Sequence, residues 1–461
     1  MTRGSLYLRF SPSGIVLAVK RALFAVVLVA ADPGCSPEAP PATKLTQEQL
    51  EDPAICQGCH ASQYTQWASS MHAYAADDPV FLAMNARGQR ETNGALGSFC
   101  VQCHAPIALR LGLTTDGSNL ASVPQWAKSV TCYFCHNTSA VTSTNDDPLV
   151  LANDGVMRAA IADPIAAAPH AGGYSLLHNG KVVASSQICG ACHDVTNQHG
   201  IDVERTFAEW RASEFSHLLS SEDNTRACPS CHMPSSQGQA ATQPLDSPVR
   251  EIHDHSMPGI DLALVDFPDR AGQRALVQSF LDASVSAQLC VTGTDAAVTL
   301  QSENVGHAWP SGAIQDRRAW LEVVAQTQGQ VVFQSGVVAD GDSISTLSDP
   351  NLWLLREQML DGTNVVEFLW QALGIGTTTT LPYATGVSGT SAQHSVSRTY
   401  TLPANVDEVA IRLRIVPIDQ AQLDLLVTSG DLAPTVRSAM SVMSVAKTTL
   451  TWVAGGPSCV N

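Results

Sequence analysis

The sequence predicts a mainly α-helical, loop-rich N-terminal domain followed by an antiparallel β-sandwich. The pentapeptide Cys-x-x-Cys-His occurs five times between residues 56 and 232, among short helical signals and turn-rich segments. From Val285 onward, apolar and polar residues alternate as they do in half-buried strands. We therefore expect a signal segment at residues 1–35, a linker at 36–50, a motif-bearing domain at 51–288 and the sandwich at 289–461.

Each pentapeptide contains the residues that attach one haem covalently. Two thiols add to the vinyl groups of a haem, and the adjacent imidazole becomes the proximal ligand of its iron. A zinc site or a disulfide is the alternative for a single motif, but five copies with histidine in the same place favour haem. We expect five c-type haems, on Cys56 and Cys59, Cys100 and Cys103, Cys132 and Cys135, Cys189 and Cys192, and Cys228 and Cys231. These are motifs 1 to 5, and their predicted proximal ligands are His60, His104, His136, His193 and His232.

The histidines outside the motifs are candidates for the sixth, distal position of each iron. Two imidazoles would leave an iron to gain and lose electrons only, whereas an open iron would bind a small molecule. The candidate distal ligands are first His72, His217, His255 and His307, and then His178 ahead of His170. Met233 and Met257 are alternative axial ligands. We expect His199, His253 and His394 to be polar surface or supporting groups.

Charge and the N-terminus restrict the partners and the compartment. The formal net charge is -17, which disfavours nucleic acid and favours redox partner proteins with a basic patch. Basic residues precede an apolar run at 22–31, the layout of a secretory signal that is too short to span a bilayer. Cys35 is a candidate for lipidation, which would be the chain's only attachment to a membrane, and cleavage near Ala31 is the alternative. Both place the chain outside the cytoplasm, in the periplasm or cell envelope.

Local signals predict several elements of the first domain. Asp78 and Pro79 are typical of an N-cap and a first helical position, for a helix reaching about Arg87. The segment Thr206-Phe-Ala-Glu209 has the form of a capping box, for a helix continuing through residue 219. Residues 235–248 are rich in Ser, Gln, Gly and Pro and predict a long loop.

The second domain shows strand signals at regular spacing. Alternating apolar residues start at Val285 and again at Val409, and Gln328-Gly329 separates two runs that predict a hairpin. This spacing favours an antiparallel sandwich. Cys290 and Cys459 stand near its two ends, and we expect a disulfide between them. His307 lies in a loop before the hairpin, so either it donates a ligand to a haem or it fixes the loop.

Several segments between and around the motifs form a recognisable pattern. They are Trp67, Ser70 and His72 after motif 1; Phe99 before motif 2; Val130 and Thr131 before motif 3; Asp154-Gly155 through His170 and His178 to motif 4 and Asp194; and His255-x-Met-Pro-Gly259. Over about residues 50–260 the chain resembles the bacterial multihaem c-type cytochromes. That family includes the tetrahaem cytochrome of ammonia oxidisers, pentahaem nitrite reductase and octahaem hydroxylamine oxidoreductase. The segment 306–323 resembles a β-rich C-terminal domain of uncharacterised multihaem cytochromes.

The resemblance implies closely stacked haems, with His72 and His217 at positions that hold distal ligands in the family. It implies electron relay between a respiratory donor and an acceptor. The alternatives are a reductase or oxidase of a small nitrogen or sulfur oxyanion, with the haem of His104 or His136 open, and an electron-transfer subunit of a larger complex. The Cys-x-x-Cys-Lys motif of pentahaem nitrite reductase does not occur in the sequence, and no residue corresponds recognisably to the cross-linking tyrosine of hydroxylamine oxidoreductase. We therefore expect an electron carrier rather than a catalytic oxidoreductase.

Overall fold

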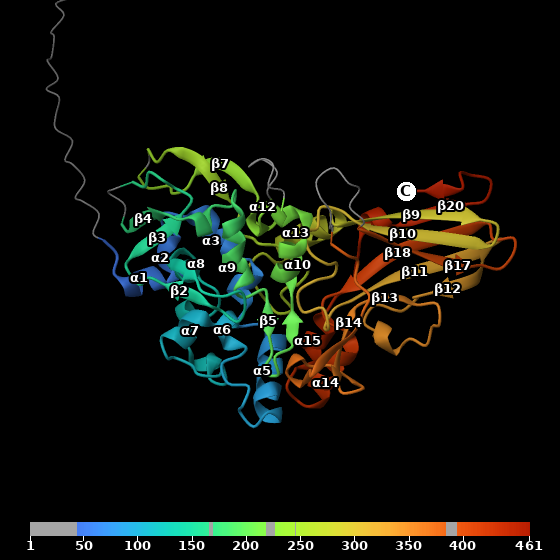
Figure 1. Cartoon of the computed structure of the whole chain (residues 1–461), viewed down its shortest axis with the longest axis horizontal. Helices are drawn as coiled ribbons and strands as arrows, with labels where there is room; N and C mark the ends of the chain where they lie inside the picture. The colour runs from blue at the N-terminus through green and yellow to red at the C-terminus, as the bar shows by residue number, and fades with distance from the viewer. Residues whose placement is uncertain (1–43, 166–168, 218–225, 245, 384–393) are drawn as a thin grey trace, which may run out of the picture. The chain divides into compact units, whose positions relative to one another are not determined.

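The computed structural model describes residues 44–165, 169–217, 226–244, 246–383 and 394–461, which belong to one compact unit. The predicted signal segment and Cys35 lie outside these residues, as does the side chain of His217. Within the described residues, no helix is both long enough and apolar enough to cross a membrane. The prediction of a helical region followed by antiparallel sheets is confirmed (Figure 1).

The haem region, residues 44–283, is built largely from very short helices. They are α1 (Gln47–Glu51), α2 (Pro53–Cys56), α3 (Ala61–Ala68), α4 (Met71–Tyr74), α5 (Pro79–Glu91), α6 (Val101–His104), α7 (Pro106–Arg110), α8 (Cys132–His136), α9 (Ser186–Gly190), α10 (Thr206–Ala212), α11 (Glu214–His217), α12 (Cys228–His232) and α13 (Arg270–Asp282). Asp78 caps α5 as predicted, since its carboxylate accepts a hydrogen bond from the Val80 amide at 3.0 Å. The helix ends at Glu91, four residues beyond the expected limit.

The predicted capping box at Thr206 is wrong. The N-cap residue of helix α10, which ends at Ala212, is Arg205, and the first-turn amides of Phe207 and Ala208 donate to the Asp194 carboxylate at 3.0 Å each. Thr206 and Glu209 instead bind a loop of the following region. The Thr206 hydroxyl accepts from the Gly312 amide at 3.0 Å, and the Glu209 carboxylate accepts from the Ala308 amide at 3.1 Å. The two side chains therefore fasten the loop instead of the helix end.

Four small strand pairs connect the helices. They are β1 (Thr138–Val141) with β2 (Leu149–Leu151), β3 (Val156–Ala159) with β4 (Ala171–Tyr174), β5 (Val195–Thr196) with β6 (Asp202–Glu204), and β7 (Ser235–Gln239) with β8 (Val249–His253). The pair of β3 and β4 is parallel and the others are antiparallel. The expected loop at 235–248 is wrong in its first part, because residues 235–239 pair with residues 249–253.

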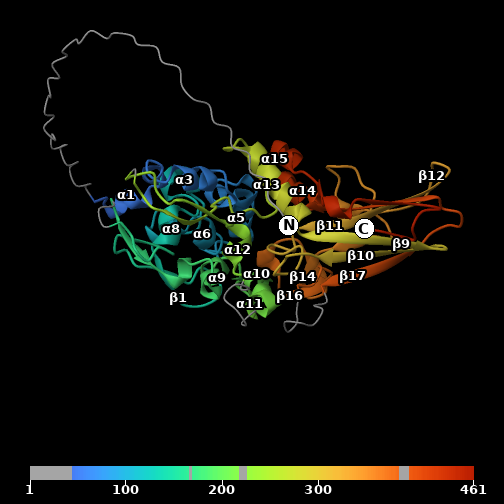
Figure 2. The same ribbon diagram turned by 90° about the horizontal axis from the view of Figure 1, so that it is seen from above.

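The sandwich region, residues 284–461, contains two larger antiparallel sheets (Figure 2). One has the order β17 (Ser395–Thr401), β10 (Asp295–Ser302), β9 (Val285–Thr292) and β21 (Cys459–Val460). The other has the order β12 (Gln330–Ser335), β11 (Arg318–Thr327), β18 (Glu408–Val416) and β19 (Met443–Ser444), with β13 (Trp353–Leu355) beside β11 and β20 (Leu450–Val453) beside β18. A third sheet holds β15 (Asn364–Val366), β14 (Glu357–Asp361) and β16 (Gly374–Thr378), and helices α14 (Gln420–Thr428) and α15 (Pro434–Ala439) complete the region.

The two larger sheets share one hydrophobic core. Inward-facing residues alternate along the strands as the sequence predicts, and Leu289, Val298, Leu321 and Leu413 are completely buried. Cys290 and Cys459, which face each other on β9 and β21, form a disulfide. The first and the last strand of the region are therefore joined covalently.

A second core crosses the predicted domain limit at residues 288 and 289. Val80 on α5 belongs to the same buried cluster as Trp320 on β11, Trp370 and Leu423 on α14. A side-chain amide makes a further connection, because Asn197 donates to the carbonyls of Leu369 and Ala372. The division into two domains at this limit stays a prediction.

Candidate haem sites

Each of the five motifs forms a turn of helix. In motifs 1, 2 and 4 the histidine amide donates to the carbonyl of the first cysteine, at 2.8 Å, 3.1 Å and 2.9 Å, and motifs 3 and 5 lie within α8 and α12. One turn brings two cysteines three residues apart onto the same side, with the histidine next to them. This is the arrangement that covalent attachment of one haem requires.

The Nδ1 atom of every motif histidine has a hydrogen-bond partner. Four of these partners are backbone carbonyls, namely Ala240 for His60 at 2.7 Å, Ala75 for His104 at 3.0 Å, Arg158 for His136 at 2.6 Å and Pro258 for His232 at 2.8 Å. The partner of His193 is the carboxylate of Glu204, at 3.1 Å. A partner on Nδ1 fixes the ring and leaves Nε2 for a metal.

Four of the motif histidines face a second histidine across a gap of nearly constant width. The ring centres are separated by 6.2 Å for His60 and His170, 6.3 Å for His193 and His72, 6.2 Å for His136 and His255, and 6.4 Å for His232 and His307. When two imidazoles bind the same metal ion from opposite sides, each with a nitrogen–metal distance of about 2 Å, their ring centres lie about 6 Å apart. These pairs therefore fit an iron between them.

The second histidine of each pair is also oriented through Nδ1. His307 contacts the Ala308 carbonyl at 2.8 Å, His255 the His253 carbonyl at 2.9 Å and His170 the Ala171 carbonyl at 3.1 Å. His72 contacts the sulfur of Met257 at 3.0 Å. All four leave Nε2 for the iron, so the residues present fit bis-histidine haems at motifs 1, 3, 4 and 5.

His178 lies near motif 3 but is oriented differently. Its ring centre is 5.7 Å from that of His136, yet its Nε2 contacts the Cys135 carbonyl at 2.9 Å, and its buried Nδ1 has no hydrogen-bond partner among the residues that the structure describes. His255 is therefore the better candidate at this motif. His170, which the sequence ranks below His178, is the histidine opposite motif 1.

Motif 2 differs from the other four. The ring of His104 stacks on Phe81 of α5, with ring centres 4.1 Å apart and planes inclined by 2°. Among the side chains that the structure describes, no histidine makes a ring contact with His104. The prediction for His217 cannot be placed here, because its side chain lies outside that set.

Contacts between cysteines give the order of the motifs in space. The thiols of Cys56 and Cys132 are close enough to shift each other's pKa in opposite directions, and the same holds for Cys189 and Cys228. Cys103 similarly raises the pKa of Cys192, and burial together with Cys192 raises the pKa of Cys135. Motif 1 is therefore next to motif 3, and motif 4 borders motifs 2, 3 and 5.

Burial keeps most of these imidazoles neutral, which is the form that binds iron. It lowers the pKa of His72, His232 and His255 to about 4 and also lowers the pKa of His60, His104 and His136. Burial acts on His193 in the same direction, but the hydrogen bond and charge of Glu204 outweigh it and raise the pKa of that ring. His193 of motif 4 is therefore the one motif histidine whose pKa is raised, while the pKa values of the other four are lowered.

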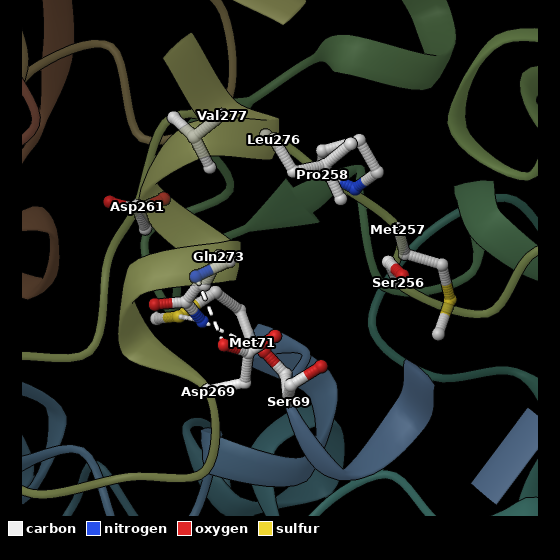
Figure 3. Close-up of a pocket in the computed structure, with 12 residues that line it drawn as sticks. Ser69, Met71, Ser256, Met257, Pro258, Asp261, Asp269, Gln273, Leu276 and Val277 are labelled. Atoms are coloured by element: carbon white, nitrogen blue, oxygen red, sulfur yellow. Dashed lines mark hydrogen bonds between the residues drawn. The ribbon is translucent and has the colours of Figure 1, made fainter. Parts of the chain in front are cut away.

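A cavity of about 190 Å³ lies beside the ligands of two motifs (Figure 3). Met257, whose sulfur contacts His72, and Pro258, whose carbonyl orients His232, line one side of it. Gln273 of α13 lines another side and donates to the Ser69 carbonyl at 3.0 Å. The segment that follows His255 thus touches the ligands of motifs 4 and 5 as well as motif 3.

Two residues of the sites were not found from the sequence. Glu204 follows a turn after motif 4, and the only local signal is the Gly200 turn that folds β6 back onto β5. Phe81 lies on the capped helix but carries no signal that distinguishes it from an ordinary core residue.

Comparison with known proteins supports haem attachment in this chain. Residues 55–137 match the family described as cytochrome c554 and c-prime. The fold is similar to the crystal structure of a penta-haem cytochrome c552 from Thermochromatium tepidum, with a TM-score of 0.60 and 19% sequence identity, over 90% of this chain and 100% of that one. No curated protein matches the sequence. Covalent c-type haems are thus implied, and the fold is similar to that of a multihaem c-type cytochrome.

Proposed function

We propose that the chain is a pentahaem c-type cytochrome that relays electrons outside the cytoplasm between a respiratory donor and an acceptor. The observation that carries the proposal is the set of four histidine pairs with ring centres 6.2–6.4 Å apart. When bound, a haem with two such ligands exchanges one electron between Fe(III) and Fe(II).

The chain's own residues contribute the order of the haems and the rigidity of their ligands. Motif 1 adjoins motif 3, and motif 4 adjoins motifs 2, 3 and 5, so the attachment points form one connected set. Hydrogen bonds at Nδ1 hold the rings of both ligands at motifs 1, 3, 4 and 5. Ligands fixed in this way keep the same positions in both oxidation states, which favours fast electron transfer.

The test is a count of haems and of open iron sites in the haem-loaded protein. Haem content per chain, the paramagnetic resonance spectrum of the oxidised form and carbon monoxide binding by the reduced form give three independent numbers. Five haems, all low-spin and none binding carbon monoxide, are the expected result. Fewer than five haems, or two or more that bind carbon monoxide, would contradict it.

One observation favours a second function, reduction or oxidation of a small nitrogen or sulfur oxyanion at motif 2. His104 stacks on Phe81 and has no histidine ring contact among the described side chains, so its iron is the candidate for an open site. This enzyme would be favoured if one haem is high-spin, binds carbon monoxide in the reduced form, and binds nitrite or hydroxylamine in the oxidised form. His217→Ala tests the remaining ligand: if the wild type is closed and this variant opens one haem, His217 is the sixth ligand of motif 2.

The proposal also includes export, redox proteins as partners and a lipid anchor at Cys35. Export is consistent with the usual location of c-type cytochromes and with a disulfide in the same chain. The mass of the mature N-terminal peptide tests the anchor: a diacylated Cys35 supports it, and an unmodified N-terminus near residue 32 excludes it.

A further inference from the structure

Motif 4 differs from the other motifs in the charge of the group that holds its proximal histidine. Four Nδ1 atoms contact neutral backbone carbonyls, whereas that of His193 contacts the Glu204 carboxylate at 3.1 Å. A hydrogen bond to an ionised acceptor is roughly twice as strong as one to a neutral acceptor. The imidazole that donates it therefore has more negative charge on its other nitrogen.

The position of Glu204 is fixed by the hairpin that follows the motif. Val195 on β5 is opposite Glu204 on β6, so the strand pair brings the carboxylate back to the histidine two residues before it. The Asn197 side chain closes the turn, accepting from the amides of His199 and Ile201 at 3.0 Å each. The contact is therefore part of a rigid local structure.

The carboxylate is also poorly neutralised by other groups. The Glu204 side chain is 18% exposed, and among the described residues no lysine or arginine forms an ion pair with it. The nearby guanidinium of Arg317 is instead paired with Asp261, at 3.1 Å and 3.2 Å. The His193 side chain is 51% exposed, so the charge of Glu204 is partly screened there but less than a charge in open solvent.

We infer that Glu204 gives the haem of motif 4 the lowest reduction potential of the five, so that motif 4 is the energetic barrier at the centre of the relay. The inference rests on the proposed function. Fe(III) has one positive charge more than Fe(II), so a more anionic imidazole stabilises the oxidised state. Motif 4 borders motifs 2, 3 and 5, so a route for electrons between motif 3 and motifs 2 or 5 runs through it.

The variant Glu204→Gln tests the inference in the haem-loaded, full-length protein. The neutral amide still accepts the hydrogen bond, so only the charge is lost. We expect the Fe(II)/Fe(III) ratio of one haem to rise about tenfold at a fixed applied potential, which is 59 mV for a one-electron couple. The measurement is a spectroelectrochemical titration followed by visible absorption and paramagnetic resonance.

Asp202→Asn is the matched control. Asp202 lies on the same strand, but its carboxylate accepts from the Thr196 hydroxyl and not from a motif histidine. This variant should leave all five couples within twofold of the wild type. A shift equal to that of Glu204→Gln would mean that general surface charge, and not the contact with His193, sets the potential.

The haem that shifts is identified through its second ligand. His72→Met changes the ligand opposite His193, so the resonance signal altered by His72→Met should be the one that moves in Glu204→Gln. If all couples stay in place in Glu204→Gln, or if a different signal moves, the inference is wrong. Should the Gln variant lose haem, Glu204→Asp keeps the charge at a greater distance, and the same haem should shift in the same direction by less.

Failure of the inference and failure of the proposed function are distinguishable. Five low-spin haems with an unshifted potential in Glu204→Gln would refute the role of Glu204 alone. A wild-type protein without a haem on motif 4 would refute the proposed function itself.

Discussion

The haem region and the sandwich region hold their structures in different ways. Of the thirteen α-helices that the structure describes before β9, nine have four or five residues. Helices of that length are not stable in water without tertiary contacts. The sandwich region instead has long paired strands, one core shared by two sheets and a disulfide.

The difference shows where each region's stability originates. In the haem region, the histidines of motifs 1, 3, 4 and 5 face partners across gaps that fit an iron, so the cofactor is the contact that joins distant segments. In the sandwich region the joining contacts are side chains of the chain itself, such as Leu289 and Leu413. Ligand binding should therefore be a large part of folding in the haem region, whereas the sandwich region offers one candidate ligand, His307, and otherwise packs around its own core.

The largest expected effect comes from withholding haem. We expect the chain produced without haem attachment to lose the fold of residues 44–283 while residues 284–461 stay folded, because the second region contributes a single candidate ligand, His307, and has a core of its own. Limited proteolysis followed by mass spectrometry should give a resistant fragment that starts near residue 284. If both regions of the haem-free chain resist the protease equally, the haem region does not depend on haem for its fold more than the sandwich region does.

The substitution Leu289→Ala destabilises the sandwich region instead of the haem region, because it removes a side chain from the core between the two larger sheets. Leu289 is completely buried between the two sheets, so its truncation should lower the free energy of unfolding of this region by about 2–5 kcal/mol. Denaturant unfolding of the haem-loaded protein measures the loss. Val331→Ala is the control, because Val331 is 55% exposed and its truncation should cost less than about 0.5 kcal/mol. A haem spectrum that changes in step with the sandwich would show that the regions unfold together.

Glu209→Gln examines the connection between the two regions. Burial raises the pKa of Glu209 to about 7, and hydrogen bonds from Ser311 and Ala308 oppose that shift only in part. The folded protein thus holds a proton that the unfolded chain releases near pH 4.5, so the contribution of Glu209 to stability falls between pH 4.5 and 7 and changes little above that. The loss amounts to about 3 kcal/mol.

The Gln variant has no such titration at residue 209. Relative to the wild type, it should therefore become more stable as the pH rises from 4.5 to 7, and the difference should be constant above pH 7. Thermal unfolding of both proteins at a series of pH values measures this difference. A difference that does not vary with pH would mean that Glu209 is ionised in the folded protein throughout this range.

The smallest effect is expected on the outer surface of the sandwich region. Lys447 and Glu303 form an ion pair at 2.7 Å, and the lysine side chain is 51% exposed. Lys447→Ala should change the free energy of unfolding by about 0.5 kcal/mol or less, with the difference disappearing in high salt. The change should be the same with and without haem, and a dependence on haem would show coupling that the ion pair's position does not predict.

The features predicted correctly are those whose sequence signal lies in residues close together along the chain. The alternation of β9 and β18 needs only nearest neighbours along the strand. The cap at Asp78 and the hairpin around Gln328-Gly329 are equally local. The wrong capping box shows the limit, since the side chains of Thr206 and Glu209 found partners about one hundred residues away.

The pairing of the distal histidines depends on long-range contacts and could not be predicted. His170 precedes β4, whose parallel pairing with β3 sets its position, and a parallel pair leaves no signal in neighbouring residues. His255 lies opposite His136 of motif 3, although the two are 119 positions apart in the sequence. Glu204 was missed for a related reason, because an exposed-looking acidic residue after a turn is common and only the register of β5 and β6 gives it a role.

The disulfide between Cys290 and Cys459 has a consequence for how the protein is made. The ten motif cysteines can accept haem only as free thiols, whereas Cys290 and Cys459 have to be oxidised. An oxidant that reached all twelve at once could join cysteines within or between motifs. Because the sandwich strands bring their own two cysteines face to face on β9 and β21, the correct pair is selected by the folding of one region. If the motifs carry haem, maturation requires ten cysteines to stay reduced while two are oxidised to a disulfide, and the fold of the sandwich region decides which two are oxidised.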